Sequence, residues 1–280
     1  GNINNCTTED FKNDALAGIN LLRKRFDKVG VIGHSEGGTI ALMLAAEKNA
    51  DFIVSLAGMV VSGAETLVSQ NRIALADAGI EADGIENYCD ALMEVFMANV
   101  NGDSMPNIEN HDLPLALKQN LHAVQHQIQM PYMTHFLALD MRPLLSRITC
   151  PVLALNGTKD IQVEHGTNLS ALRNGLPANE KNSIESIDGV NHLFQHCNTG
   201  AVSEYREIEE TISPADRRTE LLGLQLRTDE GLPAHLLRPE NAPFISMLCE
   251  EKLATLTPQG SLLLTLQGRL LADEIATELI

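Results

Sequence analysis

The segment from residue 29 to residue 47, VGVIGHSEGGTIALMLAAE, constrains the fold more than any other part of the chain. An apolar run, Val29 to Ile32, leads into a glycine-rich turn and then into a helix-forming stretch, Thr39 to Glu47. A second short apolar run, Phe52 to Leu56, follows, and runs of this kind are typical of strands covered on both faces. The order strand, helix, strand predicts parallel neighbours in an α/β sheet.

The turn has the sequence GHSEG, with Ser35 at its centre. A strand that ends in Gly-x-Ser-x-Gly and passes at once into a helix is typical of a nucleophile elbow, which projects the serine hydroxyl above the sheet. We expect Gly33 and Gly37 to be required, because a Cβ there would crowd the crossing of strand and helix. The backbone N–H of Glu36 is predicted to be one of two oxyanion donors. His34 is expected to pack or hydrogen-bond locally. A glycine-rich turn without chemistry is the alternative.

A serine nucleophile needs a base and an acid that orients the base, and in elbow-bearing folds these follow in the order acid, then histidine. Asp160 lies in NGTKD, just after the apolar run from Cys150 to Leu155. His192 lies in DGVNH, just after the short strand expected at Ser183 to Ile187. The sequence therefore predicts Asp160 as the orienting acid and His192 as the base. The alternative for Asp160 is an ordinary turn residue.

Other histidines offer competing interpretations. His165 and His196 flank the two loops and are the main rivals of His192. His122 and His126 have the i, i+4 spacing that can hold a metal on a helix. No acidic or cysteine third ligand is evident close to them in the sequence, so we expect a solvated helix face and no metal site.

Composition excludes several function classes. The 20 Lys and Arg residues against 37 Asp and Glu residues give a net charge of -17, which argues against a nucleic-acid partner. No run approaches the roughly 18 to 20 apolar residues of a membrane helix, and the first residues do not resemble a signal peptide, which favours a cytoplasmic location. The five cysteines lack metal-ligand spacing and are expected to be small buried residues rather than a disulfide framework: Cys6, Cys89, Cys150, Cys197 and Cys249.

The rest of the chain divides into three regions. A helix capped by Thr7 or Thr8 is predicted before the first strand, and its apolar face comprises Phe11, Ala15, Ile19, Leu22 and Phe26. Strand signals stop over about 63–140, which predicts a helical insertion. After residue 214 the texture becomes Leu-rich, so we expect one domain at 1–214 and a small, mainly helical domain at 215–280.

Four motifs in order resemble those of bacterial α/β-hydrolase esterases of the serine aminopeptidase-like group, over about residues 8–214. The resemblance implies a partial α/β-hydrolase core with a helical cap at about 63–140. It also implies hydrolysis of a small-molecule carboxylic ester through Ser35, His192 and Asp160, without metal or organic cofactor. The motifs are GHSEGG at 33–38, LNGTKDIQV at 155–163, NHLFQ at 191–195 and EIEETISP at 207–214.

The chain departs from that family before the elbow. Those hydrolases place several strands there, and a loop after an early strand supplies the second oxyanion N–H, whereas only about 28 residues precede Val29. We expect a core without its early strands, an open sheet edge, and a loss on the order of 100- to 1,000-fold in turnover for one missing donor. A complementing chain or a homo-oligomer is then the candidate partner.

The tail resembles a different family. Residues 217–232 and 264–276 are similar to the C-terminal helical domain of oxygen-independent coproporphyrinogen oxidase-like radical SAM proteins, which include heme chaperones. The CxxxCxxC cluster motif of that family is absent from the sequence, so no iron-sulfur or S-adenosylmethionine cofactor is expected. A Leu-rich helical bundle is the alternative. Together the two resemblances describe the later part of one protein joined to the end of another.

Two function hypotheses from different classes follow. The first is a serine carboxylesterase for small or medium acyl esters, with thioesters and peptides open because acyl transfer to serine is common to all three. The second is a catalytically impaired or inactive fusion or fragment that serves as a binding or interaction module. Heme binding by the tail is a third hypothesis.

Overall fold

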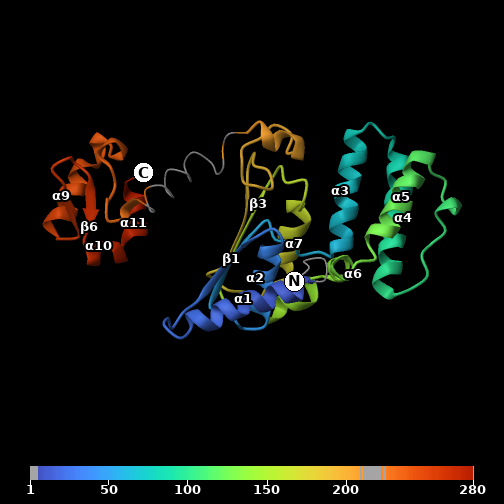
Figure 1. The fold of residues 1–280 in the computed structure, drawn as a ribbon, viewed down its shortest axis with the longest axis horizontal. Coiled ribbons are helices and arrows are strands. Elements are labelled where there is room, and N and C mark those ends of the chain that lie inside the picture. The colour runs from blue at the N-terminus through green and yellow to red at the C-terminus, as the bar shows by residue number, and fades with distance from the viewer. Residues whose placement is uncertain (1–5, 209, 211–221, 223–224, 280) are drawn as a thin grey trace. The chain divides into compact units, whose positions relative to one another are not determined.

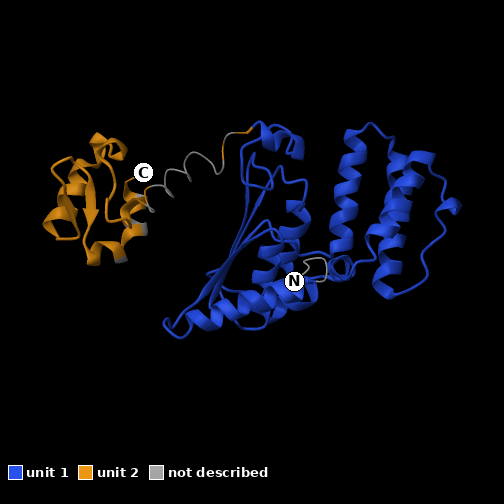
Figure 2. Ribbon diagram, viewed as in Figure 1, with its two compact units in different colours: residues 1–207 blue, residues 208–280 orange. Residues whose placement is uncertain are grey.

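The computed structural model describes residues 6–208, 210, 222 and 225–279. It divides into two compact units, residues 1–207 and residues 208–280, as Figure 2 shows. The boundary that the sequence predicts after residue 214 lies outside the described residues. Each unit has its own hydrophobic core, and each is described by itself below.

A four-stranded parallel sheet forms the centre of unit 1 (Figure 1). Its strand order follows the chain order, so each strand pairs with the next one along the sequence. The predicted α/β class and the parallel pairing of the first two strands are confirmed. The strands are β1 (Gly30–His34), β2 (Phe52–Leu56), β3 (Val152–Gly157) and β4 (Ser183–Ile187).

Three helices accompany the sheet: α1 (Thr8–Leu22), α2 (Glu36–Ala46) and α7 (His165–Gly175). Helix α2 is buried along nearly its whole length and contributes to the main core with side chains of β2, β3 and α7. Helix α1 begins at a capping box between Thr7 and Asp10, and its Ile19 packs with residues of α2 and β1.

The predicted apolar face of the first helix is only partly correct. Ile19 is buried, and Phe11 and Ala15 pack against its cluster, but Leu22 is 46% and Phe26 57% exposed. The helix ends at Leu22, so the chain leaves the helical period before Phe26 and carries that side chain away from the core. Spacing alone does not reveal this end because no glycine or proline marks it.

Residues between β2 and β3 form a helical insertion. In the described stretch 63–139 no strand occurs, as predicted, and the helices pack around their own core, which includes Tyr88, Leu92 and Phe96. This core is separate from that of the sheet. Its helices are α3 (Gly63–Asp77), α4 (Ala82–Asn101), α5 (Leu115–Gln127) and α6 (Pro131–Ala138).

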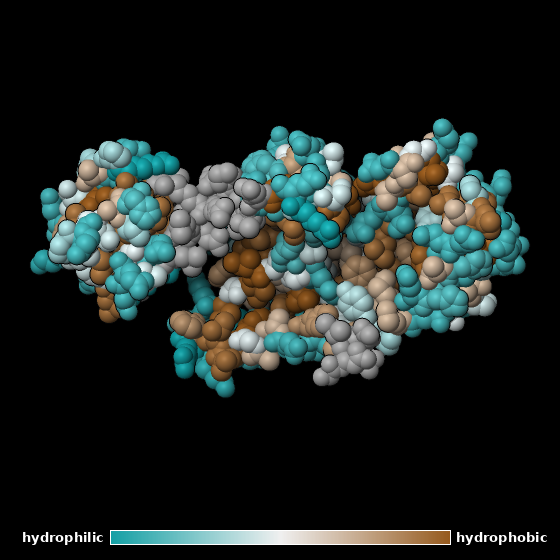
Figure 3. All heavy atoms as spheres, turned by 45° about the horizontal axis from the view of Figure 1, so that its top comes forward, coloured by the Kyte–Doolittle hydropathy of each residue, from teal (hydrophilic) through white to brown (hydrophobic). Residues whose placement is uncertain are grey.

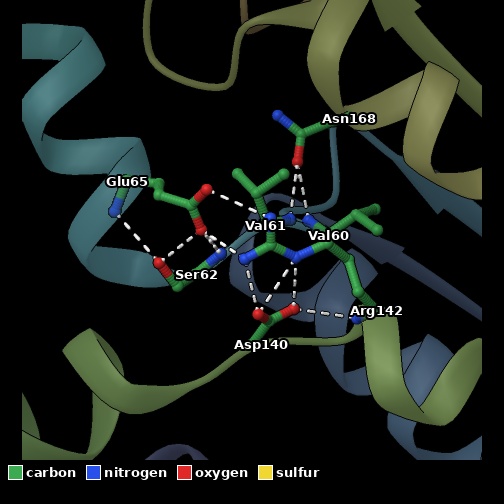
Figure 4. Close-up of polar contacts among 7 residues, drawn as sticks. All are labelled: Val60, Val61, Ser62, Glu65, Asp140, Arg142 and Asn168. Atoms are coloured by element: carbon green, nitrogen blue, oxygen red, sulfur yellow. Dashed lines mark hydrogen bonds and ion pairs between the residues drawn. The ribbon is translucent and has the colours of Figure 1, made fainter.

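The connection that enters the insertion is bound to a buried asparagine of α7 (Figure 4). The Oδ1 atom of Asn168, a residue only 2% exposed, accepts the backbone N–H groups of Val60 at 2.7 Å and Val61 at 3.2 Å. The backbone N–H of Met141, on the returning connection, donates to the carbonyl of Val60 at 3.0 Å. The entering connection is therefore attached to α7, and the returning connection is attached to the entering one.

An ion-pair network lies beside these connections and is also drawn in Figure 4. The Arg142 guanidinium donates from Nε to both carboxylate oxygens of Asp140 at 3.0 Å and from Nη1 to Glu65 Oε1 at 3.1 Å. Glu65 also accepts the backbone N–H and hydroxyl of Ser62, the N-cap of α3. Burial raises the pKa of Glu65, but its hydrogen bonds to Ser62 and Arg142 outweigh burial and lower the pKa overall.

Strand β1 lies at one edge of the sheet in the described part of the chain. Ile32 on β1 is 69% exposed and Phe52 on β2 is 44% exposed. Figure 3 shows hydrophobic residues gathered on the surface of unit 1 in the region of the sheet. One face of the sheet therefore presents apolar side chains beside an edge strand.

The described residues of unit 2 form helices and one short hairpin, where the sequence predicts a small, mainly helical domain. An antiparallel hairpin of β5 (Ala254–Leu256) and β6 (Leu262–Leu264) turns at Gly260, whose φ is 82°. The hairpin turn lies in the sequence PQG at 258–260, and its three-residue strands are too short to give a strand pattern. The described helices of the unit are α9 (Ala242–Glu250), α10 (Leu266–Leu270) and α11 (Ala272–Glu278).

Short 3-10 helices complete the described elements. They are η2 (Ile108–Asn110), η3 (Arg142–Arg147), η4 (Val202–Arg206), η5 (Ala234–Leu236) and η6 (Pro239–Asn241).

None of the helices in the described ranges combines the length and apolar character needed to cross a membrane.

Candidate functional site

Ser35 occupies a sharp turn between β1 and α2. Its φ of 56° and ψ of -123° are unusual for a residue with a side chain, and such backbone strain is concentrated at functional sites. Its backbone N–H donates to the carbonyl of Leu56 at the end of β2, 2.8 Å away. Its carbonyl accepts the N–H groups of Gly38 and Thr39 in the first turn of α2. The backbone therefore fixes the serine at the carboxyl edge of the sheet.

One of the two expected glycines and one other glycine make this crossing of strand and helix. A Cβ on Gly33 would lie 2.0 Å from the carbonyl oxygen of Gly37, so Gly33 is required as predicted. A Cβ on Gly37 itself would meet nothing within 4 Å, and the prediction for this residue is wrong. A Cβ on Gly38 would lie 2.9 Å from the Cα of Gly58, so Gly38 allows the close approach instead.

Asp160 is buried in the loop after β3. Its side chain is 0% exposed, and its Oδ1 accepts the backbone N–H groups of Gln162 and Val163, each at 2.9 Å. Its Oδ2 accepts the Nδ1–H of His192 at 2.8 Å. The carboxylate is thus oriented by the backbone on one oxygen and presented to the imidazole by the other.

His192 lies in the loop after β4 and is 4% exposed. The loop is shaped by the buried Asn191, whose Oδ1 accepts the N–H groups of Leu193 and Gln195 at 2.9 and 3.1 Å. His192 donates its Nδ1–H to Asp160, so the neutral imidazole has its lone pair on Nε2. This protonation pattern suits a general base.

The two rival histidines have other neighbours. His165 begins α7, where its Nδ1 lies 3.5 Å from a carboxylate oxygen of Glu164. His196 pairs with Val190 in an antiparallel bridge within the loop that carries His192. Of the three histidines, His192 is the one recorded in a hydrogen bond to Asp160.

His34 connects the elbow to the His192 loop, a contact that the sequence did not indicate. Its Nε2–H donates to the backbone carbonyl of His192 at 2.7 Å, across 158 residues of chain. The two rings lie 4.8 Å apart between centroids, and the His34 ring also packs edge-on against Phe194 at 6.2 Å. The residue next to Ser35 therefore contacts His192, so the elbow and the two loops meet at one edge of the sheet.

Ser35 and His192 are not joined by a hydrogen bond among the described residues. Catalytic hydrogen bonds often tighten only when substrate binds. Glu36 is the first residue of α2, and the first N–H groups of a helix have no partner within it. Its backbone N–H therefore has no partner within the helix, and its role as an oxyanion donor stays a prediction.

The Glu36 side chain joins three elements. Its Oε1 accepts the hydroxyl of Thr8 at the start of α1, 2.6 Å away, and its Oε2 accepts the hydroxyl of Tyr132 on α6 at 3.0 Å. Burial and the neighbouring Glu36 carboxylate raise the pKa of Tyr132, so its hydroxyl keeps the proton that it donates. Glu36 thereby attaches the insertion to the elbow.

A cavity of about 230 Å³ opens beside Ser35. The sheet side of its lining comes from the elbow and from the loop that carries Asp160, and the insertion supplies the opposite lining from α3 and α6. The lining residues are Ser35, Glu36, Thr39, Met59, Thr66, Gln70, Tyr132, Phe136, Gln162 and Val163. The insertion thus contributes to the space in which a molecule would meet Ser35.

The described residues contain no group of three or more His, Cys, Asp or Glu side chains that could hold a metal ion. His122 lies 3.3 Å from a carboxylate oxygen of Glu109, 13 residues away in sequence, and 47% of its side chain is exposed. This carboxylate was not evident as a neighbour from sequence spacing, and the pair lies on the surface of the insertion.

Comparisons with known proteins give matches only among solved structures. No protein-family model and no curated protein sequence matches the chain. A lipase-esterase related protein from Clostridium acetobutylicum ATCC 824 is 16% identical, with 72% of this chain and 74% of that chain covered at a TM-score of 0.41.

Two further structures are similar to the same extent. A protein described among the metagenome-derived lipolytic enzymes LipS and LipT is 17% identical at a TM-score of 0.37. The match covers 68% of this chain and 67% of that chain. Acetyl xylan esterase 1 from Thermoanaerobacterium sp. JW/SL YS485 is 18% identical at a TM-score of 0.36. The match covers 65% of this chain and 46% of that chain, so the chain spans less than half of that protein. Similarities at this level carry no inference about activity. The predicted radical SAM resemblance of the tail stays a prediction.

Proposed function

We propose that unit 1 is a serine hydrolase that cleaves small carboxylic esters through a covalent acyl-enzyme. The observation that carries the proposal is the hydrogen bond of 2.8 Å between His192 and a fully buried Asp160, in loops that contact the strained turn of Ser35 through His34. Three residues far apart in sequence thus belong to one edge of the sheet. A strained serine beside an oriented imidazole is the combination that acyl transfer requires.

In this mechanism the Ser35 Oγ attacks the ester carbonyl while His192 Nε2 takes its proton. Asp160 holds the imidazole in the Nδ1–H tautomer and stabilises the imidazolium. The backbone N–H of Glu36 donates to the oxyanion of the tetrahedral intermediate. His192 then protonates the leaving alcohol, and a water molecule activated by the same imidazole releases the acid from Ser35.

Hydrolysis of p-nitrophenyl acetate and butyrate by the purified chain tests the proposal. We expect burst release of nitrophenol from the wild type and rates at the level of buffer for Ser35→Ala. His192→Ala should lose activity to the same degree because the two residues act as a unit. Equal rates for the wild type and Ser35→Ala would reject the proposal, and thioester and peptide substrates would define the acyl-transfer class.

A binding module without catalysis is the second candidate. It is favoured by the absence of a hydrogen bond between Ser35 and His192 among the described residues, because a serine hydroxyl without a base is a poor nucleophile. Stoichiometric labelling by a fluorophosphonate together with a cooperative melt would exclude this candidate.

A further inference from the structure

Thr66 on α3 carries a hydroxyl that lacks a partner. The residue is 5% exposed, and its buried Oγ1 forms no hydrogen bond with any group in the described part of the chain. A helical threonine commonly bonds its hydroxyl to the carbonyl three or four residues earlier. Here the backbone N–H of Thr66 donates to the carbonyl of Ser62, but the Thr66 hydroxyl forms no hydrogen bond to that carbonyl. Buried hydroxyls without partners are rare in native proteins, so this one needs an explanation.

Thr66 lines the same cavity as Ser35. Other polar groups of that lining already have partners within the protein. The Thr39 hydroxyl donates to the carbonyl of Met59 at 3.0 Å, and the Gln70 amide donates to the carbonyl of Gln162 at 2.7 Å. Of the buried side-chain polar atoms in the lining, Thr66 Oγ1 is the one without a partner among the described residues.

The size of the cavity limits what can bring a partner to Thr66. A cavity of about 230 Å³ is small for a ligand site, and it suits a short acyl or alcohol group better than a long fatty acyl chain. The mixture of hydroxyl and amide groups among the apolar side chains also favours a substrate that is itself partly polar.

We propose that Thr66 Oγ1 recognises a hydroxyl group on the substrate, so that the site selects short hydroxylated esters over their unsubstituted counterparts. The inference rests on the proposed function, because it assigns the substrate class of the same site. A hydroxyl can both donate to and accept from another hydroxyl, and it is therefore a suitable partner for threonine. The substrate hydroxyl can belong to the acyl group or to the alcohol.

Three esters that differ by one hydroxyl test the inference: ethyl butyrate, ethyl 3-hydroxybutyrate and 2-hydroxyethyl butyrate. We expect the wild type to show a higher kcat/KM for one hydroxylated ester than for ethyl butyrate. Thr66→Val should reduce this preference about tenfold, the effect of one hydrogen bond. Thr66→Ser should keep it, and the preferred ester shows which side of the substrate carries the hydroxyl.

Thr39→Val is the matched control, because it removes a hydroxyl of the same cavity that already has a partner. It should leave the preference unchanged but lower the melting temperature, whereas Thr66→Val should not lower it. Equal preferences in the wild type and Thr66→Val, or a clear loss of stability in Thr66→Val, would overturn the inference while the proposed function stands. If the wild type hydrolyses none of the esters faster than Ser35→Ala, the proposed function itself fails.

Discussion

Replacing Asp160 by asparagine changes the triad with little change in volume. The Oδ1 of asparagine can still accept the N–H groups of Gln162 and Val163, so the loop should keep its shape. The amide NH2 would then face Nδ1 of His192, where the carboxylate now accepts a hydrogen bond from Nδ1–H at 2.8 Å. The imidazole would be forced to carry its proton on Nε2, and it could no longer accept the proton of Ser35.

The expected loss in kcat for Asp160→Asn is about 10,000-fold, the effect of the wrong tautomer in a serine triad. At about 1.36 kcal/mol for each factor of ten, this corresponds to about 5 kcal/mol of transition-state stabilisation. KM for p-nitrophenyl butyrate should change little, because Asp160 does not contact the substrate. Steady-state kinetics with the purified variant measures both quantities.

The control is the same change at an exposed position of the insertion, Asp103→Asn, which should leave the kinetics unchanged. Thermal melts of both variants show whether either has lost its fold. A folded Asp160→Asn variant that retains more than about a tenth of wild-type kcat would refute the role of the carboxylate as orienting acid, because that loss is far below the one expected.

Three further predictions concern the scaffold. Gly33→Ala should destabilise the fold by about 1 to 3 kcal/mol through overpacking, while Gly37→Ala should cost less than about 0.5 kcal/mol; denaturant titrations measure both. Tyr132→Phe should lower the unfolding free energy by about 1 kcal/mol, as one hydrogen bond to Glu36 is lost, and an unchanged stability would contradict the contact. Glu65 has a lowered pKa in the folded protein, so its contribution to stability is present above its ordinary pKa and is lost as the pH falls through its pKa in the folded state. Glu65→Gln should therefore melt at a lower temperature than the wild type at pH 7. This difference in melting temperature should become smaller in acid.

Local patterns in the sequence were enough to predict the scaffold. The apolar run at 52–56 coincides with β2, and the short strand expected at 183–187 coincides with β4. The strand-turn-helix around Ser35 follows from the Gly-x-Ser-x-Gly motif between an apolar run and a helix-forming stretch. The order of the residues along the chain predicts that Asp160 pairs with His192, and in the structure the two side chains form a hydrogen bond.

Contacts between distant segments could not be predicted in this way. The hydrogen bond of His34 joins residues 158 apart, and no local signal marks it. Gly38 rather than Gly37 faces the neighbouring backbone, since the rotation of α2 relative to β2 decides which glycine is crowded. The partnerless hydroxyl of Thr66 depends on a side-chain rotamer, which a helical pattern does not specify.

Intact-mass analysis after reaction with a fluorophosphonate tests the convergence of the three residues most directly. The reagent modifies a serine only when a base activates it and an oxyanion site receives the phosphoryl oxygen. We predict one adduct per chain, located on Ser35 by peptide mapping and lost in both Ser35→Ala and His192→Ala. A folded wild-type chain that forms no adduct, or one whose labelling persists without His192, would contradict the triad.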